Sequence, residues 1–331
     1  MTSPRKFRVG IIGAGNIVEC CHLPVIKNNK SLAVSWLYDV NKHRAEFVSK
    51  MFRVPLIQEA QLEASISEID ICLLAVPYGV RKVYLESCSK KGVAVYVEKP
   101  FAKTLDEHTY FSSLFQPFRL AIGFQRRYYP WVGCIGSIIS SGIFGEVKQV
   151  NLNQGFFSLK QGNSFMADVS LSGGGAIIDS AIHAMDQLLV AAKTERVSVK
   201  EVKFICKNGI DYDSIFLAEL HNGDKKFDLH AQVSSLRNLE NGLTIFFEKA
   251  TVKSNFSCNA SLQISATTSQ ETIFELQQFD LNGVVSSVND SFVFFWQEFI
   301  EGLSTYSINL THAITSTTTT SLIEQLYKKM T

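Results

Sequence analysis

Residues 8–18 read Arg-Val-Gly-Ile-Ile-Gly-Ala-Gly-Asn-Ile-Val, a short apolar run that leads into a glycine-rich turn. The run predicts a strand over 8–12, and the pattern over 18–28 predicts a helix directly after the turn. Gly13 permits a tight turn, and Gly15 lets backbone N–H groups approach a pyrophosphate at the positive end of the helix. Val18 stands where a third glycine is usual, so an ordinary strand-to-helix turn is the alternative. The order strand, turn, helix favours a dinucleotide site.

The first 123 residues continue this alternation of apolar runs and helical patterns. We expect strands at 8–12, 33–38, 69–75, 94–97 and 120–123, and helices at 18–28, 42–51, 81–90 and 105–114. Such alternation predicts a parallel sheet with helices on both faces, and ligands then bind beyond the carboxyl ends of the strands. Four residues at or just after strand ends should share that crevice: Gly13, Asp39, Pro77 and Lys99.

The pattern changes after residue 123. We expect a helix at 131–141, a strand at 147–157 and a helix at 176–192, then strands over 198–285 separated by turn signals at Asn208-Gly209, Asn222-Gly223, Asn241-Gly242 and Asn282-Gly283. Two helices, at 292–303 and 315–327, close the chain, although the threonines at 317–320 lower helix propensity. The fold class is therefore α/β, with a parallel first domain (1–123) and a second domain (124–331) built on a mostly antiparallel open sheet.

Composition limits the classes of partner. The 331 residues carry a formal net charge of +1, which gives no electrostatic reason to expect nucleic acid or an anionic membrane surface. The polar N-terminal residues do not resemble a secretion signal. The 7 cysteines form no CxxC pair, so we expect reduced thiols, no metal site and a cytoplasmic location.

Asp39 ends the second expected strand, where a carboxylate can hydrogen-bond a ribose 2′-hydroxyl and repel a 2′-phosphate. This favours NAD, with NADP possible because Lys42 and Arg44 follow closely and could receive a phosphate. Asp39 can also cap the following helix, and the two roles are compatible.

Lys99 lies in the tripeptide Glu98-Lys99-Pro100 at the end of the fourth expected strand. The Lys99-Pro100 bond is a candidate for the cis form, which would direct the amine into the crevice. A lysine desolvated there has a pKa lowered toward neutrality and can exchange a proton with a substrate oxygen. The alternative is a surface lysine paired with Glu98.

A second group of polar residues follows the run Gly173-Gly174-Gly175. Asp179 and His183 are four residues apart on an expected helix, so we expect both on one face, where imidazole can act as a base and the carboxylate can orient an amine or a hydroxyl. A satisfied core histidine is the alternative for His183, and Asp186 is expected to be a structural partner. Arg127 could bind a phosphate or hydroxyls, or take part in an ion-pair network. The other histidines, His22 among them, lack comparable neighbours in the sequence.

Together these motifs resemble the glucose-fructose oxidoreductase / inositol dehydrogenase / rhizopine-catabolism (Gfo/Idh/MocA) family. The resemblance covers about residues 7–190 and then only 295–302. It implies an N-terminal Rossmann domain, a C-terminal substrate-binding and oligomerisation domain, and a homodimer or homotetramer. It also implies that Lys99 is the acid/base, that Asp179 and His183 flank it as catalytic and substrate-binding residues, and that Arg127 contacts substrate.

The sequence therefore predicts an NAD(P)-dependent dehydrogenase or reductase that moves a hydride between the nicotinamide and a hydroxyl or keto carbon of a sugar, nucleotide sugar or cyclitol. The expected cofactor contacts are Gly13, Gly15, Asn16, Ile17, Asp39, Pro77, Glu98 and Lys99. The alternative is a dinucleotide-binding regulatory or sensor protein without turnover. The sequence does not identify the sugar, the carbon or the direction of the reaction.

Overall fold

The computed structural model describes residues 6–158, 165–266, 272–276 and 285–330. Two compact units are present, and each is described by itself. The first comprises Met1–Phe101, Asp106–Gln125 and Phe292–Ile314, and the second comprises Ala102–Leu105, Arg126–Ser291 and Thr315–Thr331.

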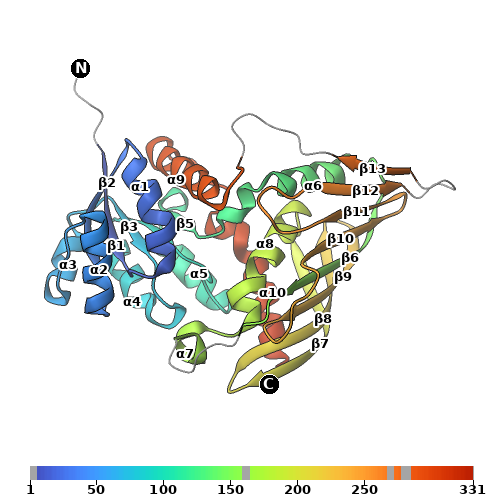
Figure 1. The fold of residues 1–331 in the computed structure, drawn as a ribbon, viewed down its shortest axis with the longest axis horizontal. Helices are drawn as coiled ribbons and strands as arrows, with labels where there is room; N and C mark the ends of the chain where they lie inside the picture. The colour runs from blue at the N-terminus through green and yellow to red at the C-terminus, as the bar shows by residue number, and fades with distance from the viewer. Residues whose placement is uncertain (1–5, 159–164, 267–271, 277–284, 331) are drawn as a thin grey trace. The chain divides into compact units, whose positions relative to one another are not determined.

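The first unit is built on a parallel sheet of five strands in the order β2-β1-β3-β4-β5 (Figure 1). The strands are β1 (Phe7–Ile12), β2 (Leu32–Tyr38), β3 (Ile71–Leu74), β4 (Ala94–Val97) and β5 (Leu120–Ile122). All residues of β3, β4 and β5 are buried, as expected for central strands covered on both faces. The strand order reverses direction at β1, so the carboxyl ends of β1 and β3 form the topological switch point where such sheets bind ligands.

The helices of this unit are α1 (Leu23–Asn28), α2 (Lys42–Phe52), α3 (Glu59–Ile66), α4 (Lys82–Lys90) and nearly all of α5 (Leu105–Ser113). Helix α3 was not expected from the sequence, because its apolar pattern is weak. Reciprocal hydrogen bonds between Gln58 and Gln61 form a capping box at its start, and Leu62 and Ile66 anchor one face.

The chain returns to the first unit near its end. Helix α9 (Val288–Thr305) carries Phe295, whose ring stacks on Tyr96 of β4 at 4.2 Å, and Trp296, which is fully buried. The expected division at 123/124 therefore differs from the observed units in this respect, because the aromatic face of α9 packs on the Rossmann sheet. The roles assigned to the two domains stay predictions.

The second unit contains an eight-stranded sheet in the order β13-β12-β11-β10-β6-β9-β8-β7. Its strands are β6 (Val147–Gly155), β7 (Arg196–Lys207), β8 (Ile210–Asn222), β9 (Lys225–Ser234), β10 (Gly242–Phe247), β11 (Ala250–Ser254), β12 (Leu262–Ala266) and β13 (Thr272–Leu276). Among the strand pairings that the described residues form in this sheet, β6–β9 alone is parallel. The α/β class, with one parallel and one mostly antiparallel sheet, is confirmed.

Some of the turns that the sequence predicts are present in the structure, and one is not. Asn208 and Gly209 join β7 and β8 with φ of 53° and 75°, and Gly223 lies in the two-residue connection between β8 and β9. Asn241-Gly242 is not a hairpin turn: the Asn241 side chain accepts from Gly155 N at 2.5 Å and donates to Gly155 O, so it ties the start of β10 to β6. The signal at 282–283 lies outside the described residues.

Helices α6 (Pro130–Ser141), α8 (Ile182–Ala191) and α10 (Thr317–Lys328) accompany this sheet, with the short α7 (Val169–Ser172) (Figure 1). The threonine run does not prevent α10 from forming. Thr318 Oγ1 donates to Thr194 O and Thr319 Oγ1 to Asp186 Oδ1, so packing and side-chain hydrogen bonds override a weak propensity. None of the helices in the described parts of the chain is long and apolar enough to cross a membrane.

Candidate functional site

The glycine turn lies at the carboxyl end of β1. Gly13 has φ of +103°, and a Cβ added there would collide with the Ala75 carbonyl at the end of β3. Its N–H donates to Tyr38 O at 2.8 Å. Gly15 differs, since a Cβ there would meet nothing within 4 Å. Gly13 is thus required by the fold, whereas the surface over Gly15 is open to a ligand.

The segment after the turn presents backbone amides at a helix start. The first helical hydrogen bonds run from Val18 and Glu19 to Gly15 O, at 3.0 and 3.2 Å. The amides of Gly15, Asn16 and Ile17 therefore precede the first hydrogen-bonded turn, where N–H groups have no partner within the helix. A π-helical turn, Val18–His22, then continues into α1. Orphan amides beside an open glycine fit an anionic pyrophosphate.

Asp39 holds this turn from β2. Its Oδ2 accepts from Ala14 N at 2.6 Å and its Oδ1 from Asn41 N at 2.8 Å. Arg44 binds the same residue through the next peptide group, where its Nε donates to Ala14 O at 2.7 Å. Arg44 also donates to Asn16 Oδ1 and forms an ion pair with Glu19. The Arg44 guanidinium, which the sequence suggested as a phosphate ligand, is thus already hydrogen-bonded to the glycine turn.

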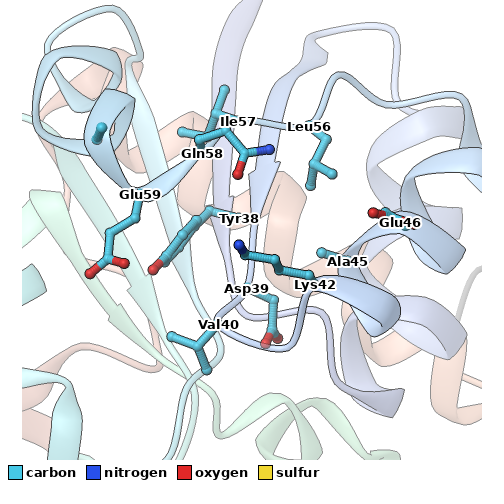
Figure 2. Close-up of a pocket in the computed structure, with 11 residues that line it drawn as sticks. Tyr38, Asp39, Val40, Lys42, Ala45, Glu46, Leu56, Ile57, Gln58 and Glu59 are labelled. Atoms are coloured by element: carbon cyan, nitrogen blue, oxygen red, sulfur yellow. The ribbon is translucent and has the colours of Figure 1, made fainter.

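A cavity of about 530 Å³ lies at the carboxyl end of β2. Its lining includes Tyr38, Asp39, Lys42, Gln58 and Glu59. Figure 2 shows the Lys42 amine directed toward Tyr38 and Gln58, while the Asp39 carboxylate points away from them. Asp39 therefore separates the cavity from the glycine turn, and Lys42, not Arg44, contributes the cation on the cavity side.

The tripeptide 98–100 follows β4, and Lys99-Pro100 is a cis peptide, as expected. Arg81 donates to the carbonyls on both sides of Lys99, Glu98 O at 2.7 Å and Pro100 O. It also donates to Val76 O at 3.0 Å, beside Pro77 at the end of β3. The carboxyl ends of β3 and β4 are thus tied together by one buried guanidinium.

The Glu98 side chain contacts the core of its own unit. Its Oε1 accepts from His22 Nε2 at 2.9 Å. Gly123 leaves room for this carboxylate, because a Cβ there would come within 2.8 Å of Glu98 Oε2. A cofactor contact by Glu98 stays a prediction, and His22, which the sequence analysis set aside, proves to be its partner.

In the second unit, Asp211 anchors the segment that carries Asp179 and His183. Asp211 Oδ1 accepts from Gly175 N at 2.6 Å and from the Tyr327 hydroxyl at 2.5 Å, and Oδ2 accepts from Ile177 N at 2.8 Å. Burial, followed by the Asp211 carboxylate, raises the pKa of the Tyr327 hydroxyl well above its usual range. The close approach requires Gly175, since a Cβ there would strike the Asp211 backbone.

One uninterrupted helix over 176–192 was expected, and the structure differs. Ile177–Ala181 is π-helical and only Ile182–Ala191 is α-helical. The wider turn changes the angular spacing, so the four-residue rule for an α-helix face does not apply at Asp179. Asp179 is exposed, whereas His183 is 6% exposed. Their roles stay predictions; Lys99 belongs to the first unit, and Asp179, His183 and Arg127 belong to the second.

Arg127 lies in a buried network. Its Nε and Nη2 donate to the two Asp186 oxygens at 2.7 and 2.6 Å, and its Nη1 donates to Thr315 Oγ1 at 2.6 Å. Thr319 Oγ1 also donates to Asp186 Oδ1, at 2.8 Å. Asp186 is thus the structural partner it was expected to be. A substrate contact by Arg127 stays a prediction.

Four residues of this framework were not found from the sequence: His22, Arg81, Asp211 and Tyr327. Arg81 was expected at the start of a helix over 81–90, where arginine is ordinarily solvated. Asp211 follows the Asn208-Gly209 turn, a position typical of exposed strand ends. No local signal separates these four from surface residues, because their partners are distant in the chain.

Comparison with known proteins adds the family context. The family described as an oxidoreductase family with an NAD-binding Rossmann fold matches residues 7–115, and the GFO/IDH/MocA C-terminal domain matches residues 135–253. The rhizopine catabolism protein MocA of Rhizobium meliloti is 25% identical over 186 residues, 55% of this chain and 56% of MocA. An inositol 2-dehydrogenase of Rhizobium meliloti (strain 1021) is 25% identical over 218 residues, 63% of each chain. The matches thus span less than two thirds of these relatives.

The fold itself is shared over almost the whole length. The crystal structure of KijD10, a 3-ketoreductase from Actinomadura kijaniata in complex with NADP and TDP-benzene, superposes with a TM-score of 0.80. The alignment covers 98% of each chain at 14% identity, which shows the fold alone.

Proposed function

This chain belongs to the GFO/IDH/MocA oxidoreductase family, and we propose that it transfers a hydride between a nicotinamide dinucleotide and a hydroxyl or keto carbon of a sugar, nucleotide sugar or cyclitol. The observation that carries the proposal is the glycine turn, where open Gly15 adjoins the amides at the helix start. Relatives include an inositol 2-dehydrogenase, and a protein of the same fold is a 3-ketoreductase in complex with NADP.

The residues assigned to the dinucleotide have distinct tasks. The amides of Gly15, Asn16 and Ile17 bind the pyrophosphate, and Asp39 accepts from a ribose hydroxyl while it holds Ala14. Pro77, Glu98 and Lys99 follow the ends of β3 and β4, where the nicotinamide half is expected. When bound, the nicotinamide supplies the hydride acceptor or donor. NAD is the favoured cofactor, and NADP stays possible because Lys42 lines the cavity beside Asp39 and Arg44 lies close behind it.

Lys99 is assigned the proton transfer. In the oxidising direction its neutral amine accepts the hydroxyl proton as the carbon loses hydride, and in reduction it returns the proton to the carbonyl oxygen. Asp179 and His183 are assigned substrate contacts, with Asp179 as an orienting carboxylate and His183 as a second proton-transfer group. Arg127 is assigned a substrate contact, for which its network with Asp186 holds it rigidly.

We also propose a homodimer or homotetramer formed through the eight-stranded sheet. Two isoleucines on neighbouring strands are exposed on this sheet, Ile205 at 59% and Ile215 at 50%. Exposed apolar side chains on a sheet are typical of an interaction surface. The molar mass in solution, measured by light scattering for the wild type and for Ile215→Lys, tests this assembly.

The first test separates cofactor binding from turnover. Titration with NAD and NADP should show binding that Gly15→Ala weakens at least tenfold without altering stability, because its Cβ meets no protein atom. Unchanged affinity in that variant would remove the dinucleotide from this turn. Pooled sugars, cyclitols and nucleotide sugars are then screened by nicotinamide absorbance, and Lys99→Ala should lower turnover by roughly 10²–10⁴. Dinucleotide binding without redox change over the whole pool would favour the regulatory alternative.

A further inference from the structure

Arg81 is a buried arginine that the proposed reaction does not use. It is the N-cap residue of α4, four residues after Pro77, and is only 1% exposed. Burial lowers the pKa of its guanidinium to about 10, although Glu98, Tyr78 and Glu107 act in the opposite direction. Burying the charged Arg81 side chain costs desolvation free energy. An arginine at a solvent-exposed helix start would not carry this cost.

The contacts of Arg81 converge on the segment that carries Lys99. Nη1 donates to Glu98 O at 2.7 Å and to Pro100 O, the two carbonyls that flank Lys99. Nη2 donates to Val76 O at 3.0 Å. Carbonyl groups on both sides of Lys99 are therefore fixed to one rigid planar group, which is itself anchored to the end of β3.

The geometry is specific to a guanidinium. Its planar fork reaches three carbonyls at fixed angles, whereas a lysine ammonium is a point donor on a flexible stem. Arg81 Nε is buried without a hydrogen-bond partner among the described residues, so part of the desolvation cost is not recovered. A buried polar atom without a hydrogen-bond partner costs stability. Its presence here indicates that the position of the Arg81 guanidinium matters more than that cost.

We propose that Arg81 is a positioning residue that fixes the direction in which the Lys99 side chain leaves the end of β4. The proposal rests on the assignment of Lys99 as the acid/base. Arg81 acts through the backbone at Glu98 and Pro100, and it keeps this segment in register with Val76-Pro77. Small displacements of a reacting group are costly, since about 1 Å can reduce turnover by roughly 10².

The test uses the full-length protein with its lysines reductively methylated with ¹³C, and NMR then reports on each dimethylamine. The Lys99 signal is assigned by its loss in Lys99→Arg. The variants are Arg81→Lys and Arg81→Gln, with circular dichroism as the check on folding. Arg119→Gln is the matched control, because Arg119 also donates to a backbone carbonyl, Gly92 O, but at the surface.

We expect the Lys99 signal to shift or broaden in both Arg81 variants and to stay unchanged in the control. Turnover should fall by roughly 10–10² in the Arg81 variants, with the dissociation constant for NAD within about twofold of the wild type. Free guanidinium ion at millimolar concentration should restore part of the turnover of Arg81→Gly, and methylammonium should not. An unchanged Lys99 signal in folded Arg81→Lys and Arg81→Gln would overturn the proposal.

The two proposals fail in different ways. If the wild type turns over no compound in the pool while the Lys99 signal still responds to Arg81, the hydride-transfer proposal fails and the positioning relationship stands. If turnover is found and abolished by Lys99→Ala, but the Arg81 variants keep both the signal and the rate, only the positioning role fails.

Discussion

Trp296 Nε1 donates a hydrogen bond of 3.2 Å to His22 Nδ1, which joins α9 to the helix after the glycine turn across 274 residues of sequence. An indole N–H can only donate, so His22 Nδ1 must be the acceptor. The ring proton is then on Nε2, which lies 2.9 Å from Glu98 Oε1. The tautomer of this buried histidine is thus fixed on both sides, by the Trp296 indole at Nδ1 and by the Glu98 carboxylate at Nε2.

The variant Trp296→Phe tests this relationship. It removes the donor to His22, so we expect a loss of about 1–3 kcal/mol in the free energy of unfolding and a changed Nδ1 chemical shift, while the Glu98 carboxylate keeps the ring proton on Nε2. Urea unfolding and the ¹⁵N chemical shifts of His22 measure the two effects. Trp131→Phe is the control, because the Trp131 indole N–H is buried without a partner among the described residues. A His22 Nδ1 chemical shift that is the same in Trp296→Phe and in the wild type would contradict the hydrogen bond from Trp296.

Cofactor preference should depend on the Glu19–Arg44 ion pair. Glu19→Gln weakens the hold on Arg44, whose guanidinium otherwise contacts Ala14 O and Asn16 Oδ1. We expect the released Arg44 to donate hydrogen bonds to a 2′-phosphate. The affinity for NADP relative to NAD should then rise by several-fold, up to about tenfold. Arg44→Gln should shift the ratio in the opposite direction. Dissociation constants for both dinucleotides measure it, and a ratio unaffected by either change would rule out this role of Arg44.

Stability should fall in mild acid because of His108. The pKa of His108 is lowered from 6.5 to about 4, mainly by burial; the hydrogen bond to Ala313 O opposes this shift and His312 acts in the same direction as burial. Between about pH 6.5 and 4 the unfolded chain binds a proton that the folded chain does not, so the free energy of unfolding decreases as the pH falls. The loss attributable to His108 is on the order of 3 kcal/mol.

Urea unfolding at pH 7.5 and pH 5 measures this dependence. His108→Gln should flatten it, since the neutral amide does not titrate and can still donate to Ala313 O. His43→Gln is the control, because His43 is exposed. A slope in His108→Gln as steep as that of the wild type would place the dependence in other groups.

Substitutions of Asp211 and of its partner Tyr327 should lower the free energy of unfolding by different amounts. Tyr327→Phe removes one of three donors to Asp211 and should cost about 1–2 kcal/mol, whereas Asp211→Ala leaves the buried Ile177 amide unpaired and the Gly175 amide with only the Tyr327 hydroxyl, and should cost more. Hydrogen exchange at these two amides should accelerate in both variants. Tyr110→Phe, which removes an exposed bond to Glu86, is the control. Slow exchange at Gly175 and Ile177 in Asp211→Ala would show that another group anchors the segment.

The sequence by itself determined the elements whose causes are local. The apolar runs at 8–12, 71–74 and 94–97 became buried parallel strands because they contain few residues that tolerate solvent on either face. Gly13 was identifiable because a tight turn needs its backbone freedom, and in the structure its φ is +103°. The sequence also placed Lys99 at a strand end, since only Glu98 separates it from the buried strand.

Only the tertiary structure decided which polar residues became partners. Trp296 meets His22, and Tyr327 meets Asp211, across 274 and 116 residues, distances over which no periodicity carries information. Asn241 looked like a turn residue but bonds Gly155, 86 residues away, because β10 pairs with β6. The π-helical turn at 177–181 and the burial of Arg81 have the same origin: the neighbours of a segment, rather than its own residues, set its final geometry.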